Sequence, residues 1–420
     1  MFNQGLSLDQ APPISVIMRF FLTIPFFGIL LSGALFLSDA QTLLEWDLPQ
    51  TAAVVHLVVL GIAGMAMVGA LFQMLPVIAG AAIKEARYHA FWIHILLVLG
   101  TVMLFGALFF DRYILMHPAM LLLTGSLGFV VFLMLMKLFA VENKTPSVKG
   151  MIFSLSSLGL GLLFALLLTL ALMGVDTGVD PLVLRAVHLH FMLLGWIGVL
   201  VMAVAFQVIE MFYVTPPYPK AVTSLFPAAV FVLLLVYAAA SFVFEALLPF
   251  IDIALALLFL IFALVTLRRL MQRKRPVADA TVWLWRIAMG ALALASLFAL
   301  IASLSAFKPA ASASALLFAY FILSVIFAMS YKIVPFLVWF HLNAKGVMQT
   351  PMMGDIIPAK RAMRHLWIHA ALLAAGVALL ATPYAWKLVA ALLAAESLLY
   401  GANLLRAMRI YQSLKDKGIL

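Results

Sequence analysis

Cysteine is absent from this chain of 420 residues, and charged residues are scarce. Without cysteine there are no disulfides, no thiolate metal sites and no covalent attachment of c-type haem. Charged residues make up 10% of the chain and hydrophobic residues 66%, with a mean hydropathy of +1.19. Water-soluble domains of this length do not have such a composition, so we expect an all-α, polytopic membrane protein.

Twelve apolar stretches are long enough to cross a hydrocarbon core of about 30 Å. They cover residues 16–38, 52–80, 89–110, 115–140, 150–174, 182–213, 221–247, 250–268, 281–306, 312–340, 363–382 and 385–406. The first stretch lacks a basic leader and a cleavage site of small residues, so it is expected to be a span rather than a secretory signal.

The net charge of +10 comes from basic residues that gather in alternate loops. Lys84, Lys144, Arg269 and Lys345 mark four of these loops, and the opposite loops are short and acidic, as at Asp47. By the positive-inside rule, both termini are expected in the cytoplasm. The expected surroundings are a lipid bilayer, and the charge does not indicate a nucleic-acid partner.

One transmembrane pattern occurs twice, each time beginning with histidine. From His56 the sequence is HLVVLGIAGMAMVGALFQMLP, and from His190 it is HFMLLGWIGVLVMAVAFQVIE. The match needs no gap and includes Gly61 with Gly195. A histidine inside a membrane span is costly without a partner, so its presence in both copies indicates a function.

The repeat predicts one transmembrane domain built from three four-helix units, at about 16–140, 150–268 and 281–406. Span ten carries a third copy, in which Lys332 takes the place of Gln73 and Gln207. The histidine position of this copy is occupied by Ala315. Spans three and eleven also match, since Trp92-Ile93-His94 recurs as Trp367-Ile368-His369.

Histidines on the second helices of four-helix units resemble the central subunit of haem–copper oxidases and the NnrS family of haem- and copper-containing bacterial membrane proteins. The resemblance implies a bacterial inner membrane as location, one or two b-type haems, a possible copper, and an electron-donor protein or quinone as partner. The chain departs from the oxidases because spans seven and ten lack the histidines that hold their copper and haems. The pattern His-x-His lies instead in span six, at His188 and His190.

We expect His56 and His190 to hold a haem between two equivalent helices, because haem iron binds two neutral imidazoles. His188 points about 200° away from His190 on an α-helix and is expected to serve a second haem or copper. Arg185, one turn before His188, is placed for a propionate. Gly61 and Gly195 permit close helix approach or make room for the macrocycle.

A second group of histidines lies toward the cytoplasmic side. His94, His365 and His369 are candidate ligands for a metal or haem, and His365 and His369 share one helix face. The alternative is that these residues are amphipathic groups at the membrane interface, beside tryptophans.

Charged residues inside the spans must pair, protonate or face water. An ion pair between Glu210 and Lys332 is one explanation. The other is a proton or cation path from the cytoplasm, formed by Lys332, Glu210, Gln73, Gln207, Tyr331 and Glu396.

Three functions follow from these patterns. The first is a haem-binding membrane protein for electron transfer, or one that responds to nitric oxide or oxygen. The second is a transporter of metal, haem or a small cation, and the third is a partner subunit without its own cofactor. The sequence assigns no catalytic residue.

Overall fold

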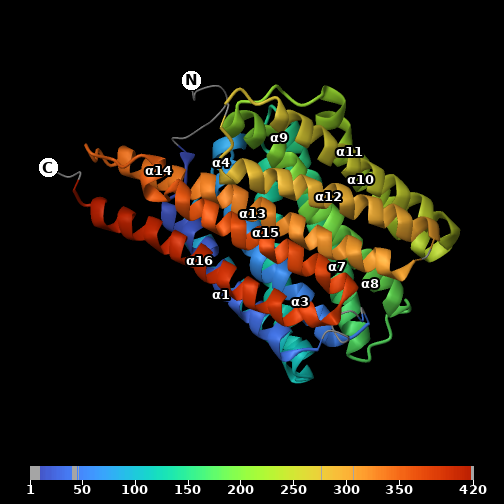
Figure 1. Cartoon of the computed structure of the whole chain (residues 1–420). Helices are drawn as coiled ribbons and strands as arrows, with labels where there is room; N and C mark the ends of the chain where they lie inside the picture. The colour runs from blue at the N-terminus through green and yellow to red at the C-terminus, as the bar shows by residue number, and fades with distance from the viewer. Residues whose placement is uncertain (1–9, 40–44, 46, 276, 306, 418–420) are drawn as a thin grey trace.

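The computed structural model is all-helical (Figure 1) and describes residues 10–39, 45, 47–275, 277–305 and 307–417. Within those ranges there is no β-strand, and twelve helices are long and apolar enough to cross a membrane. The predicted class and the predicted number of spans are therefore confirmed.

The spans are numbered along the chain. They are α1 (Ile14–Leu37), α3–η2–α4 (Pro49–Ala79), α5 (Ala86–Phe109), η3–α6 (Tyr113–Phe139), α7 (Pro146–Leu172), α8–η4–α9 (Pro181–Tyr213), α10 (Lys220–Val243), η5–α11 (Glu245–Met271), α12 (Ala280–Ser305), α13 (Lys308–Ala344), α15 (Ala359–Ala381) and α16 (Trp386–Leu414). Two short helices, α14 (Met353–Ile356) and η6 (Pro383–Ala385), lie in loops.

Local sequence explains where several spans begin and end. The Thr145 hydroxyl accepts the Val148 N–H at 3.3 Å, and the Asp180 carboxylate accepts the Leu182 N–H at 2.8 Å. Each capping residue is followed by proline at the first helical position, where no N–H is needed. Gly80 ends α4 with a φ of 64°, a left-handed conformation that glycine adopts without strain.

The bundle closes on itself. Consecutive spans pack together, and α1 packs along α16, so the first and last spans lie side by side (Figure 1). An even number of spans brings both termini to one end of the bundle, at the upper left of Figure 1. We call this the terminal end; α3 and α8 begin at the opposite end.

Spans two, six and ten form the interior. The share of buried residues in their apolar windows is 61%, 67% and 72%, whereas the other nine described spans range from 22% to 44%. The two spans with the histidine repeat and the span with its third copy are therefore the three most enclosed.

Both histidine-bearing spans contain a π-helix at the same place. η2 (Leu57–Gly64) follows His56 directly, and η4 (Phe191–Gly198) follows His190 directly. Each π-helix has eight residues and continues into an α-helix of fifteen residues, α4 (Met65–Ala79) or α9 (Val199–Tyr213). π-helices are rare and are frequently found at functional sites.

Candidate cofactor site

Two histidines face one another near the end opposite the termini. His56 closes α3 (Pro49–His56) and His188 lies in α8 (Pro181–His190). Their ring centroids are 6.3 Å apart and their planes differ by 16°. Each is the eighth residue of its helix, so each lies roughly 10 Å along the helix axis from its start.

One nitrogen of each ring is anchored to a backbone carbonyl. His56 Nδ1 lies 2.7 Å from the Ala52 oxygen, and His188 Nδ1 lies 2.9 Å from the Gly161 oxygen on α7. A carbonyl only accepts, so the geometry assigns the hydrogen to Nδ1 in both rings. Among the described residues neither Nε2 has a hydrogen-bond partner, and both rings are half-buried.

This arrangement fits axial ligation of a haem. Metal-bound histidines commonly donate their second N–H to a carbonyl, which fixes the tautomer and orients the ring. With metal–nitrogen bonds of about 2.0 Å, two imidazoles on opposite sides of one iron have centroids about 6 Å apart. The observed separation of 6.3 Å agrees with that requirement.

The same residues fit a bare copper ion poorly. Within the described part of the chain, no group of three or more histidine, cysteine, aspartate or glutamate side chains is placed to hold a metal ion. A porphyrin brings four nitrogens of its own, so two protein ligands complete its iron. The donor set favours haem over the copper that the resemblance implied.

His190 does not face His56, contrary to our expectation. Its Nδ1 lies 2.8 Å from the Ala186 oxygen and its Nε2 lies 3.0 Å from Asp252 Oδ1 on α11. Its ring also stacks on Tyr237 of α10, with centroids 3.9 Å apart. Both nitrogens are engaged, so His190 ties α8 to α10 and α11 and has no free lone pair for iron.

The repeat itself explains this correction. His56 and His190 bond the carbonyl four residues earlier in the same way, so they are equivalent. Equivalent residues of two matching helices need not point toward each other. His188 lies on the other face of α8, as the angle of about 200° predicts, and that face meets His56.

Arg185 has a protein partner. Its guanidinium lies 2.8 Å from Asp47 Oδ1, and the two side chains are 41% and 81% exposed. The pair joins α8 to the loop before α3 beyond the two histidines. Arg185 therefore bridges the two helices in this structure, rather than standing free for a propionate as we expected.

The two conserved glycine positions of the repeat serve close packing. A Cβ on Gly61 would lie 2.5 Å from the Phe27 ring of α1, and a Cβ on Gly195 would lie 2.6 Å from Ser157 of α7. The space beside each glycine is filled by these side chains, so a macrocycle does not fit there. Of the two roles predicted for these glycines, close helix approach is the one that the structure has.

The histidines near the terminal end are hydrogen-bonded rather than free. His94 Nε2 lies 2.7 Å from Thr23 Oγ1 of α1. His365 and His369 are completely buried, and both contact Glu396 of α16. The remaining nitrogens contact Tyr331 and Ser324. Three of the four nitrogens of His365 and His369 are hydrogen-bonded to protein groups, and the fourth, His365 Nε2, lies 3.3 Å from Glu396 Oε1 without a hydrogen bond.

The residues of the expected proton or cation path have separate hydrogen-bond partners in the structure. Tyr331 and Glu396 belong to this buried group, but Lys332 bonds Asp279 Oδ2 at 2.6 Å, ahead of α12. Glu210 accepts the Tyr218 N–H at 2.8 Å across the proline-rich turn. The Glu210–Lys332 ion pair was therefore a wrong prediction. Gln73 is buried with an unpartnered Oε1, and Gln207 is half-buried.

Sequence reasoning missed several partners, among them Asp252, Tyr237 and Ser324. Asp252 was detectable, because it is a charged residue within an apolar stretch and such residues need a partner. Tyr237 and Ser324 carry no such signal, since tyrosine rings pack readily among apolar side chains and serine hydroxyls bond the carbonyl four residues earlier, as Ser324 does with Tyr320.

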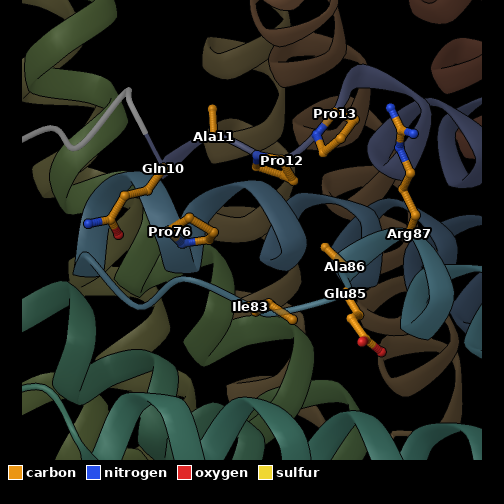
Figure 2. Close-up of a pocket in the computed structure, with 9 residues that line it drawn as sticks. All are labelled: Gln10, Ala11, Pro12, Pro13, Pro76, Ile83, Glu85, Ala86 and Arg87. Carbon is orange, nitrogen blue, oxygen red and sulfur yellow. The ribbon is translucent and has the colours of Figure 1, made fainter.

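A surface hollow lies elsewhere. It has a volume of about 360 Å³ and lies between residues 10–13, Pro76 and the start of α5 (Figure 2). Glu85 and Arg87 lie at its edge and point to different sides in Figure 2. No histidine lines it, so we assign it no cofactor.

No protein-family model matches this chain, and no curated protein matches it. The site must therefore be judged from its own geometry.

Proposed function

We propose that this protein is a haem-binding membrane protein that holds one b-type haem between His56 and His188 and serves electron transfer. The observation that carries the proposal is the pair of imidazoles whose centroids lie 6.3 Å apart, each with Nδ1 on a backbone carbonyl and Nε2 free. Haem iron with two histidine ligands exchanges one electron between ferric and ferrous states.

The residues around the pair support that role. The carbonyls of Ala52 and Gly161 hold the rings neutral on Nδ1 and leave both Nε2 lone pairs for ligation. If both His56 and His188 held the iron, no coordination site would remain for a gas, which favours electron transfer over a response to nitric oxide or oxygen. The partner that fits is an electron-donor protein or a quinone.

We further propose three four-helix units in a bacterial inner membrane, with both termini in the cytoplasm. Support for the units comes from the burial of every fourth span and from the two matching π-helices. Support for the orientation comes from the basic loops, which precede α5 and α7 and follow α11 and α13 at the terminal end.

The test is a reduced-minus-oxidised visible spectrum of the detergent-purified protein. We expect a Soret band and a sharp α-band, both lost in His56→Ala and in His188→Ala. The matched control is His190→Ala, which has the same change two residues from His188 and should keep the haem spectrum. Loss of colour in His190→Ala with retention in His188→Ala would overturn the ligand assignment.

A colourless wild-type protein, purified from cells supplied with haem precursor, would overturn the haem proposal as a whole. Binding of another metal ion by that colourless protein, lost in His56→Ala, would then favour a transporter.

A further inference from the structure

Three helices, α13, α15 and α16, enclose a polar cluster that the proposed haem site does not use. Its centre is His365, His369 and Glu396, and each of these side chains is 0% exposed. A carboxylate in such surroundings is costly unless it is paired or protonated. The hydrogen bonds around it show where its protons lie.

His369 carries a hydrogen on both ring nitrogens. Ser324 donates its single hydroxyl hydrogen to the Tyr320 carbonyl at 2.7 Å, so it must accept from His369 Nε2, also at 2.7 Å. His369 Nδ1 lies 2.6 Å from Glu396 Oε1, which accepts when ionised. The network therefore favours an imidazolium beside a carboxylate.

His365 is neutral by the same reasoning. Asn403 donates from Nδ2 to the Tyr331 hydroxyl at 2.9 Å, and Tyr331 donates to His365 Nδ1 at 2.5 Å. The ring hydrogen then lies on Nε2, which is 3.3 Å from the same Glu396 Oε1. The His369 N–H donates to this oxygen, whereas the His365 Nε2 lies near it without making a hydrogen bond.

The second carboxylate oxygen has no partner. Glu396 Oε2 is buried and accepts no hydrogen bond within the described residues. The cluster holds one proton more than a carboxylate with two neutral imidazoles, and this proton lies on His369 next to an oxygen that can also take it. We propose that His365, His369 and Glu396 form a binding site for one exchangeable proton.

Other charges near the cluster do not replace this proton. The helices packed beside it include α1 and α12, whose charged residues are Arg19 and Arg286. Their guanidinium groups lie over Phe91 and Trp283 instead. Tyr320, Tyr331 and Tyr400 are the remaining titratable groups that face the site, and each is a neutral hydroxyl that bonds a neighbour.

Polar contacts lead from the cluster toward the terminal end. Tyr331 bonds Asn403, and the Asn403 Oδ1 accepts from Arg361 at 3.4 Å. Arg361 is half-buried near the start of α15. Exchange of the proton is therefore expected from the terminal end rather than from the end with His56.

Infrared difference spectra of the purified full chain test this site without relying on bound haem. At neutral pH, wild type minus Glu396→Gln should show carboxylate bands and no carboxylic-acid carbonyl band. In His369→Gln the buried Glu396 loses its cation and should become protonated, so an acid carbonyl band should appear. That band should vanish in His369→Gln/Glu396→Gln.

A pH series then tests exchange. Raising the pH should remove one proton from the wild type, and the imidazole and carboxylate bands should change together. In Ser324→Ala the charged His369 ring loses a hydrogen bond, so the same change should occur at lower pH, shifted by about tenfold in proton concentration. An acid carbonyl band of Glu396 in the neutral wild type, or no titration in any folded state, would overturn the proposal. Ser324→Ala keeps all three titratable groups, so it serves if His369→Gln fails to fold.

Discussion

The histidines of this bundle differ in how many ring nitrogens the protein engages. His190 and His369 have both nitrogens hydrogen-bonded, so each braces helices or holds a proton. His56 and His188 have only Nδ1 engaged, and their free nitrogens belong to rings that face each other. The facing of two rings that each keep an unbonded Nε2, rather than depth in the membrane, selects the candidate ligands.

The ion pair between Lys332 and Asp279 leads to a pH-dependent prediction. Burial by itself raises the pKa of Asp279. The opposing effects are larger, so the pKa lies below its ordinary value: they are hydrogen bonds from Lys332 and Thr281, the positive charge of Lys332, and a hydrogen bond from the Val282 N–H. A carboxyl with a lowered folded pKa stabilises the fold above its unfolded pKa of about 3.9, and this contribution is lost as pH falls through the folded pKa.

We compare the melting temperatures of the wild type and Asp279→Asn over a range of pH, because asparagine can still cap α12 but carries no charge. We expect the melting temperature of the variant in detergent to be lower than that of the wild type at pH 7. The difference should stay constant down to about pH 5 and shrink below about pH 4. A difference that widens on acidification would contradict the assignment. Lys332→Met should reduce the pH dependence, since it removes the cation.

At the scale of helices, the two π-helices affect which way the residues before them face. η2 and η4 begin at matching positions after His56 and His190, so the two spans share an unusual backbone. A π-helix changes the angle between residues before and after it. The direction of His56 relative to α4 therefore cannot be obtained from the α-helical period alone.

The approach of α1 to η2 depends on Gly61. A Cβ there would meet Phe27 at 2.5 to 2.8 Å, and Phe27 is completely buried. We expect Gly61→Ala to lower the free energy of unfolding by about 1–3 kcal/mol, because overpacking forces side chains or backbone to shift. Thermal denaturation in detergent measures the change.

Gly33→Ala is the matched control, since Gly33 lies in α1 and a Cβ there would meet nothing within 4 Å. Alanine favours a helix over glycine by roughly 0.5–1 kcal/mol, so this variant should be as stable as the wild type or slightly more stable. Equal stability of both variants would show that the contact with Phe27 can relax.

For the whole molecule, twelve described spans place both termini at one end, and the absence of cysteine makes the orientation easy to test. Asp176→Cys lies in an exposed loop at the end opposite the termini, and Asn143→Cys lies in an exposed loop at the terminal end. We expect a membrane-impermeant maleimide to label Asp176→Cys in spheroplasts, and Asn143→Cys only after permeabilisation. The reverse pattern would invert the orientation.

The membrane class and the twelve spans follow from composition and hydropathy, because apolar length is a local property of the chain. The enclosed position of spans two, six and ten does not, because burial depends on how the helices pack. The partner of His56 cannot be obtained from composition or from the repeat. Which faces of α3 and α8 meet depends on helix rotation, on two π-helices and on packing against α1 and α7, and these contacts join residues far apart in the sequence. Only the tertiary structure could place His188 opposite His56 and gather His365, His369 and Glu396 around one buried proton.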